Sequence, residues 1–477
     1  MTRRWRVGLV ALALGCASGE PRVPGLFRAG TAKIKITPSE LGWLLCYDRH
    51  QKAEAVEADL WVRALALEDA GGGRGVLVSA EILGFPPSLA RSIREEARRR
   101  FGLADGRLLL SATHTHNGPV MPDRPSLEIY HGFTEEETRP VHAYANVFRA
   151  RVLEAIDRAL SGLRPARLSW ARGRATFGAN RRQKINPNGP NDPDVPVLSV
   201  AGAEGNAVAT IFTYACHCTT VMADTFFRYH SDYAGAAAED LERARPGLTA
   251  LFVAGCGGDI NPDPRGKVEL IREHGAALAA AVEETRSRLR PVAGPLKVSW
   301  REIDLPLEKA PGRDLLGPLL QYKIAARVSP EVEKSLPIPE RRELSVHAAQ
   351  RRHAREMLRR MERGPLPTSV PFPILIWRFG SDLTLVALSG ETCVDYALRL
   401  KRELGPERTW VAGYANEVAC YIPSDRVLSE GGYEAGWLPD PGRAVAGGSI
   451  MWYGWPAPLA PGLEDRIITG VHRMLAD

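Results

Sequence analysis

The residues best suited to chemistry are two histidines, His114 and His116, which directly follow an apolar run. The run 108–112 predicts a buried strand, and Gly118-Pro119 then turns the chain. Residues i and i+2 of an extended segment point to the same face. If the strand persists to His116, both imidazoles therefore project to one side, and neutral imidazole is a common zinc ligand. So short a pattern is equally typical of an ordinary polar junction between a strand and a loop. The rest of the chain must therefore decide between this junction and a metal site.

The surrounding elements predict an α/β or mixed α+β protein, with a mixed central sheet, helices packed on it and active-site loops at the strand ends. Strand-like apolar stretches alternate with amphipathic helical stretches along most of the chain. Four of the buried strands end on polar or glycine-containing loops, which carry His114, His217, Asp259 and Glu391. Because α/β proteins build their sites at strand ends, these loops predict a metal site made from residues far apart in the sequence.

Composition and charge limit the kinds of partner, such as nucleic acid or a membrane, that the sequence predicts. The 477 residues carry a formal net charge of +6, but no compact basic cluster with interleaved aromatic residues is visible, which argues against nucleic-acid binding. Past the N-terminus no stretch is long and apolar enough to predict a membrane helix. The mature chain is therefore expected to be soluble or peripherally associated with a membrane. Residues 307–366 are charged, helical and punctuated by proline, and predict an excursion outside the sheet.

The N-terminus predicts export. Three arginines in the first six residues precede the short apolar run 7–15, and small residues follow. This is the pattern of a signal peptide over residues 1–19. Leu14-Gly15-Cys16 also resembles a lipobox, so both ordinary cleavage and lipid attachment at Cys16 remain open. Either route would bring the protein to the periplasm, the medium or the cell envelope.

Two cysteines, Cys216 and Cys218, flank His217 and suggest a Cys-His-Cys zinc site. In a strand, however, their side chains would point away from His217. We therefore interpret both as small buried hydrophobic residues.

Nine motifs in order resemble those of the neutral, non-lysosomal ceramidases and their bacterial relatives. They cover about residues 27–475, and they are RAGTAKIKITP, SATHTHNGP, ANRR, DPDVPVLSV, YACHCTTV, HSDYAG, GCGGDINP, LSGETC and GGYEAG. The resemblance implies a catalytic domain over residues 27–477 and a zinc-dependent amidohydrolase that cleaves a linear amide, in ceramide or a related N-acyl lipid. Ceramidases also carry a C-terminal immunoglobulin-like domain, and the sequence, which ends at Asp477, predicts that this one lacks it.

The resemblance also implies a set of site residues. It implies that one zinc ion is held by His114, His217, Glu391 and Tyr433. The two imidazole nitrogens and the carboxylate form a catalytic-type shell with room for a water molecule, which zinc would activate for attack on the amide carbonyl. Tyr433 would either bind weakly or donate a hydrogen bond to the oxyanion.

The same resemblance implies residues around the zinc ion. His116 and Arg181 would face the substrate, and either would stabilise the oxyanion. Asp259 or Asp232 would orient a histidine, or would only cap its own turn.

Departures from the family pattern leave the substrate open. The His-Pro-Thr of ceramidases reads His217-Cys218-Thr219 here. Aromatic residues near the C-terminus would form either an apolar groove for a lipid or the packed edge of the core; they are Trp437, Trp452, Tyr453 and Trp455.

Two alternative functions remain. One is another metallohydrolase, of the amidohydrolase or binuclear phosphoesterase type, in which two metal ions per chain are expected. The other is a non-catalytic exported binding protein on the same fold.

Overall fold

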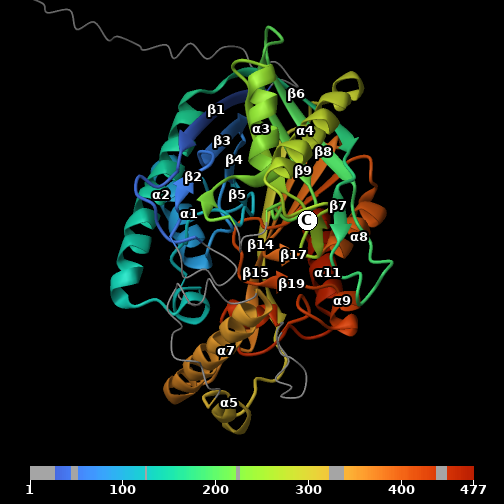
Figure 1. Ribbon diagram of the computed structural model, residues 1–477. Coiled ribbons are helices and arrows are strands. Elements are labelled where there is room, and N and C mark those ends of the chain that lie inside the picture. The colour runs from blue at the N-terminus through green and yellow to red at the C-terminus, as the bar shows by residue number, and fades with distance from the viewer. Residues whose placement is uncertain (1–26, 45–51, 124–125, 222–225, 322–337, 437–447) are drawn as a thin grey trace, which may run out of the picture.

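The computed structural model describes the chain except residues 1–26, 45–51, 124–125, 222–225, 322–337 and 437–447 (Figure 1). The proposed signal peptide therefore lies outside the described residues. Within them, a nine-stranded mixed sheet runs in the order β11-β9-β8-β6-β1-β3-β4-β5, with β13 paired to β6. Its strands are β1 (Phe27–Lys35), β3 (Trp61–Glu68), β4 (Arg74–Ala80), β5 (Leu108–Ala112), β6 (Arg164–Arg174), β8 (Asp194–Gly202), β9 (Ala207–Tyr214), β11 (Thr249–Ala254) and β13 (Arg290–Val292).

A second, four-stranded sheet packs against this one. Its order is β14-β15-β16-β18, in the part of the chain that the structure describes. Its strands are β14 (Leu296–Pro306), β15 (Ser369–Phe379), β16 (Leu383–Leu388) and β18 (Thr409–Ala412). One core cluster joins the sheets, because Leu65, Leu109 and Ile211 of the first pack with Leu375 and Trp377 of the second.

Alternation along the strands explains the layers. In β3, Leu65 and Leu67 face the second sheet, whereas Val62 and Ala64 face helices. This period of two is expected of strands buried on both faces. The outer face of the large sheet is covered by α1 (Pro87–Phe101), α2 (Glu135–Ser161), α3 (Asp232–Ala244) and α4 (Glu269–Glu283).

Helices also cover the outer face of the second sheet. They are α7 (Ile338–Arg363), α8 (Val394–Leu404) and α11 (Leu463–Ala476), with α10 (Ser449–Trp452) beside them. The molecule is thus a four-layer α/β/β/α arrangement, and the expected mixed α/β class is confirmed. In the predicted excursion, α5 (Arg313–Leu319) and α7 project from one end of the molecule (Figure 1).

Short paired strands tie the loops together where the candidate site lies. β7 (Gly178–Asn180) pairs with β12 (Ile260–Pro262), and β17 (Glu391–Thr392) pairs with β19 (Tyr421–Ile422). The pair β2 (Ala55–Val56) and β10 (Arg228–Tyr229) lies in another short sheet. Each pair joins two loops that follow strands of the same large sheet, so it fixes the positions of those loops relative to each other.

Candidate metal centre

The two histidines of the opening motif converge through a turn rather than along a strand. The strand β5 ends at Ala112, and His114 has a φ of 65°, in the left-handed region. Their Nε2 atoms lie 3.2 Å apart. The expectation that an extended strand carries both imidazoles is therefore wrong in its geometry, although the side chains do meet. Left-handed backbone at a residue other than glycine is uncommon and is often found at functional sites.

His217 reaches the same point from the end of β9. The loop after β5 and the loop after β9 are joined by a bridge between Thr115 and Cys218. The ring centroids of His114 and His217 lie 4.8 Å apart. One potential ligand atom from each of His114, His116 and His217 lies within 4.8 Å of the others, and all three residues are buried.

Backbone carbonyls determine which nitrogen of each histidine faces the centre. The Nδ1 atom of His114 lies 2.7 Å from the carbonyl oxygen of Leu83. The Nδ1 atom of His217 lies 2.7 Å from that of Gly257. A carbonyl only accepts hydrogen bonds, so each Nδ1 carries the proton and each Nε2 keeps a lone pair. This is the arrangement that orients histidine for a metal.

His116 and His217 are held in the neutral form. Burial, followed by the positive charge of Arg181, lowers the pKa of His217 to about 4. Burial, followed by the neighbouring His114, also lowers the pKa of His116 well below its ordinary value. At neutral pH both rings therefore offer lone pairs rather than a positive charge.

Glu391 completes the cluster from the second sheet. Its Oε2 atom lies 3.3 Å from Nε2 of His114 and 3.2 Å from Nε2 of His217. A buried carboxylate therefore faces the Nε2 atoms of both imidazoles.

One glycine, on the loop after β11 whose Gly257 carbonyl contacts His217, allows that loop to touch the loop of Glu391. The amide of Gly258 donates to the carbonyl oxygen of Thr392 over 2.9 Å. A Cβ atom at this position would lie 2.6 Å from the carbonyl oxygen of Glu391. Glycine is thus required here for a close approach of two backbones.

This donor set fits a zinc ion. Imidazole nitrogen and carboxylate oxygen are the ligands of catalytic zinc sites. Lone pairs and a carboxylate packed this closely repel one another unless a cation lies between them. The residues at the centre therefore have the chemistry that a divalent cation would complement.

Two further tyrosines, Tyr421 and Tyr453, contact residues of the centre. The hydroxyl of Tyr453 donates to Oε1 of Glu391, and the hydroxyl of Tyr421 lies 3.1 Å from Nε2 of His217. Tyr433 is 37% exposed, and its ring centroid lies 5.4 Å from that of Tyr421. Sequence reasoning gave Tyr421 and Tyr453 no place at the metal.

Arg181 lies beside the centre as the sequence predicts. Its Nη1 atom lies 3.4 Å from Nε2 of His217. Its Nη2 atom donates to the hydroxyl of Tyr421 over 3.1 Å, and its Nε atom donates to Glu434 over 2.7 Å. Burial lowers the pKa of Arg181, but Tyr421 and Glu434 outweigh it and raise that pKa well above its usual value. A permanent positive charge therefore faces the cluster.

The carboxylate of Asp259 bonds to its own surroundings rather than to a histidine. It accepts from Asn180 over 3.0 Å, from the amide of Val394 over 2.9 Å, and pairs with Arg426 at 3.2 Å. The expectation that it orients a histidine is corrected by these contacts, because carbonyl oxygens take that place. Asp259 instead joins the loop after β11 to α8 and to α9 (Asp425–Glu430).

Asp232 links the start of α3 to the loop that follows His217. Its carboxylate accepts from the hydroxyl and the amide of Thr220 on that loop, and from the amide of Tyr233. These contacts include no histidine, and α3 begins at Asp232 without a side-chain cap.

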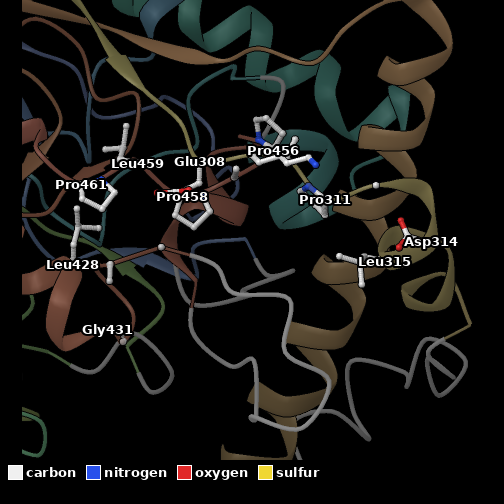
Figure 2. A pocket seen from close by; sticks show the side chains of 17 residues that line it. Glu308, Pro311, Asp314, Leu315, Leu428, Gly431, Pro456, Pro458, Leu459 and Pro461 are labelled. Carbon is white, nitrogen blue, oxygen red and sulfur yellow. The ribbon is translucent and has the colours of Figure 1, made fainter.

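The aromatic residues near the C-terminus divide between core and site. Trp452 and Trp455 pack against the core cluster of the second sheet, Tyr453 faces Glu391, and Trp437 lies outside the described residues. A separate pocket of about 690 Å³ lies between the segments 308–315, 428–436 and 456–461. Figure 2 shows that prolines and leucines are among the residues that line it.

The two cysteines beside His217 are buried and free, as expected. Among the described residues, no helix combines the length and the apolar character needed to cross a membrane.

Comparison with known proteins gives consistent relatives, although no family model matches the chain. The neutral ceramidase of Pseudomonas aeruginosa is 26% identical over 277 residues, which are 53% of this chain and 39% of that protein. Neutral ceramidase A of Dictyostelium discoideum is 26% identical over 233 residues, 43% of this chain and 31% of that protein. The alignments thus span about a third of the length of these curated relatives.

Two solved structures resemble this chain over more of its length than the sequence alignments do. A ceramidase complexed with C2 has a TM-score of 0.63 at 20% identity, and covers 90% of this chain and 73% of its own. The crystal structure of the Pseudomonas aeruginosa neutral ceramidase has a TM-score of 0.62 at 21% identity, with 93% and 75% covered. At these identities the likeness shows the fold. Together with the sequence matches, it makes this chain a relative of the neutral ceramidases.

Proposed function

We propose that the protein is a zinc-dependent hydrolase that cleaves the amide bond of ceramide or a related N-acyl lipid. The observation that carries the proposal is the buried meeting of the Nε2 atoms of His114 and His217 with the carboxylate of Glu391. The names of the relatives, neutral ceramidase and ceramidase complexed with C2, support this class of substrate.

The proposed roles follow from the contacts. His114, His217 and Glu391 would hold the zinc ion. Bound there, zinc supplies Lewis acidity and lowers the pKa of a bound water molecule towards about 7. Tyr453 keeps Oε1 of Glu391 hydrogen-bonded, which orients the other oxygen, Oε2, towards the histidines.

Arg181 and His116 would act on the substrate. The Nη1 group of Arg181 faces the centre and can donate to the carbonyl oxygen of an amide, where negative charge develops. His116 is neutral and lies against His114, so its ring can exchange a hydrogen bond with the scissile group. For a neutral amide, these contacts provide stabilisation that grows as charge appears in the transition state.

We infer in addition that the protein is exported. The charged and apolar N-terminal pattern over residues 1–19 supports this, as does the Cys16 context for lipid attachment. Peripheral association with a membrane would bring the protein to a lipid substrate.

The proposal is tested on the purified mature chain. We expect about one zinc ion per chain, and chelator-sensitive hydrolysis of N-acyl sphingoid bases in preference to N-acyl amino acids, N-acyl amino sugars and simple peptides. Two metal ions per chain would indicate the other class of metallohydrolase. If metal content is full in both His114→Ala and Glu391→Ala, the proposed centre is wrong. No bound metal and no hydrolysis would indicate a binding protein.

A further inference from the structure

A second buried acidic residue, Glu434, contacts Arg181, which in turn lies beside the metal centre. Its Oε1 atom accepts from Nε of Arg181 over 2.7 Å, and its Oε2 atom accepts from Nη1 of Arg182 over 2.5 Å. The carboxylate is 4% exposed and the Arg182 side chain 1% exposed. Both oxygens are thus committed to neighbouring arginines in a place that water scarcely reaches.

These contacts determine where the guanidinium of Arg181 points. Guanidinium is planar, and its donors form a rigid fork. Glu434 holds the Nε edge, and Tyr421 accepts from Nη2 over 3.1 Å. With two edges held, Nη1 can point only towards His217, at 3.4 Å.

Glu434 is itself held firmly. Arg182 donates to the carbonyl oxygen of Gly431 over 2.7 Å and pairs with Glu430 at 3.1 Å. Gly431 and Gly432 have φ values of 71° and 93°, so this turn depends on left-handed backbone. The turn and Arg182 therefore fix the carboxylate before any substrate arrives.

The negative charge of Glu434 also offsets the positive charge of Arg181. A buried arginine beside a proposed cation site would repel the cation, and a carboxylate at 2.7 Å offsets that repulsion. Glu434 therefore permits a positive side chain to stay within reach of the reacting group.

We propose that Glu434 is a positioning residue that aims Nη1 of Arg181 at the substrate carbonyl and neutralises Arg181 next to the metal. It touches neither the histidines nor the site of attack; it acts through Arg181. The kinetic test of this inference rests on the proposed function, because it needs a substrate that the protein hydrolyses. The crystallographic test, which follows the position of Arg181, does not depend on that function.

The test is a double-mutant cycle with Glu434→Gln, Arg181→Met and the double variant, all assayed with an N-acyl sphingoid base. Loss of a donor to a developing oxyanion lowers kcat by roughly 100-fold or more. We expect each single variant to lose about that factor in kcat with KM changed much less. In the Arg181→Met background, Glu434→Gln should lower kcat by less than about a further 3-fold, because the guanidinium that Glu434 positions is then absent.

Glu430→Gln is the matched control. Glu430 also pairs with Arg182, at 3.1 Å, and is hydrogen-bonded by Arg426, but its contacts do not include Arg181. This variant should keep kcat within about 3-fold of native. Equal losses in Glu430→Gln and Glu434→Gln would show general loosening of the turn and overturn the proposal, as would strict additivity in the cycle.

A crystal structure of Glu434→Gln separates this inference from the proposed function. We expect Nη1 of Arg181 to leave the vicinity of His217 while the histidines and Glu391 stay in place. An unmoved Arg181 would overturn the inference even where the native protein hydrolyses the substrate. If the native protein hydrolyses no N-acyl amide but Arg181 moves, the positioning role stands and the proposed function fails.

Discussion

Glu391 contributes the negative charge of the proposed centre, and its contacts allow a sharp prediction. Glu391→Gln keeps the shape of the side chain but removes the charge that faces His114 and His217. We expect zinc affinity to fall by roughly 100-fold or more, since loss of even a residue that only supports a ligand costs about 10- to 100-fold. Competition with a chromogenic chelator measures this.

The control for that measurement is Glu407→Gln, because the Glu407 side chain is 68% exposed and pairs with Arg172 rather than with a residue of the centre. Its affinity should match the native value. Native affinity in Glu391→Gln would mean that the carboxylate is no ligand.

The tyrosines give a second prediction at this scale. Tyr453 donates to Glu391, whereas Tyr433 packs on Tyr421 and is more exposed. We expect Tyr453→Phe to lower zinc affinity or kcat by about 10- to 100-fold, and Tyr433→Phe to have the smaller effect. Parallel zinc titrations and rate measurements on both variants decide, and the reverse order would restore the assignment made from the sequence.

At the residue scale, the strand-end loops predicted a site that includes His114, His217 and Glu391, whereas Arg181 was expected only from the resemblance to ceramidases. The sequence missed Tyr453 for a physical reason. A hydroxyl that reaches Glu391 across 62 positions depends on how α10 packs, which no local spacing encodes. The carbonyl partners of His114 and His217 are equally invisible, because backbone oxygens have no sequence signature. Tyr421 stands directly opposite Glu391 in the paired strands β17 and β19, and this pairing too is visible only in the structure.

At the scale of elements, α7 is anchored by a histidine that must remain neutral. His353 is buried, and its Nε2 atom lies 2.8 Å from the carbonyl oxygen of Trp455. Burial lowers the pKa of His353 to about 4. The unfolded chain, with a pKa near 6.5, binds the proton more readily below that pH. The stability that this residue contributes is therefore complete above about pH 6.5 and is lost as the pH falls towards 4.

This gives a prediction for acid stability. Between pH 7 and pH 5 the native protein should lose about 2 kcal/mol of unfolding free energy through His353 alone. His353→Gln, which can still donate to Trp455, should show a correspondingly flatter decline. Urea unfolding at the two pH values measures the difference, with His472→Gln as an exposed control. Parallel declines in native and His353→Gln would show that protonation of His353 does not limit stability.

The predicted elements were most accurate where periodicity is strong, as in the alternating strands of the large sheet. The excursion over residues 307–366 was predicted as helical from its charge and proline pattern, and α5 and α7 lie within it. Its packing on residues 450–455 could not be predicted, because the contacting residues His353 and Trp455 lie 102 positions apart.

At the scale of the molecule, the proposed ligands come from different layers. His114 and His217 follow strands of the large sheet, and Glu391 follows β16 of the second. A cation bound between them would therefore stabilise the packing of the sheets on each other. At a free zinc concentration of 100 to 1,000 times Kd, the stabilisation is about 3 to 4 kcal/mol.

The corresponding experiment is removal of the metal. Dialysis against a chelator should lower the Tm of the native protein, and zinc, but not magnesium, should restore it. His114→Ala should unfold at the same Tm with and without the chelator. A native Tm that does not respond to chelation would contradict a metal bridge between the sheets.

The close approach at Gly258 also has a consequence for interpreting genomes. A Cβ atom there would meet the backbone of Glu391 and Thr392, so a larger residue would separate the loop that carries Glu391 from the loop after β11, whose Gly257 carbonyl orients His217. Paralogues that keep the histidine motif but replace this glycine are expected to be pseudoenzymes that bind no zinc. Position 258 is therefore a useful marker for sorting active from inactive members among distant sequences, and replacing it with alanine in this chain is the direct check.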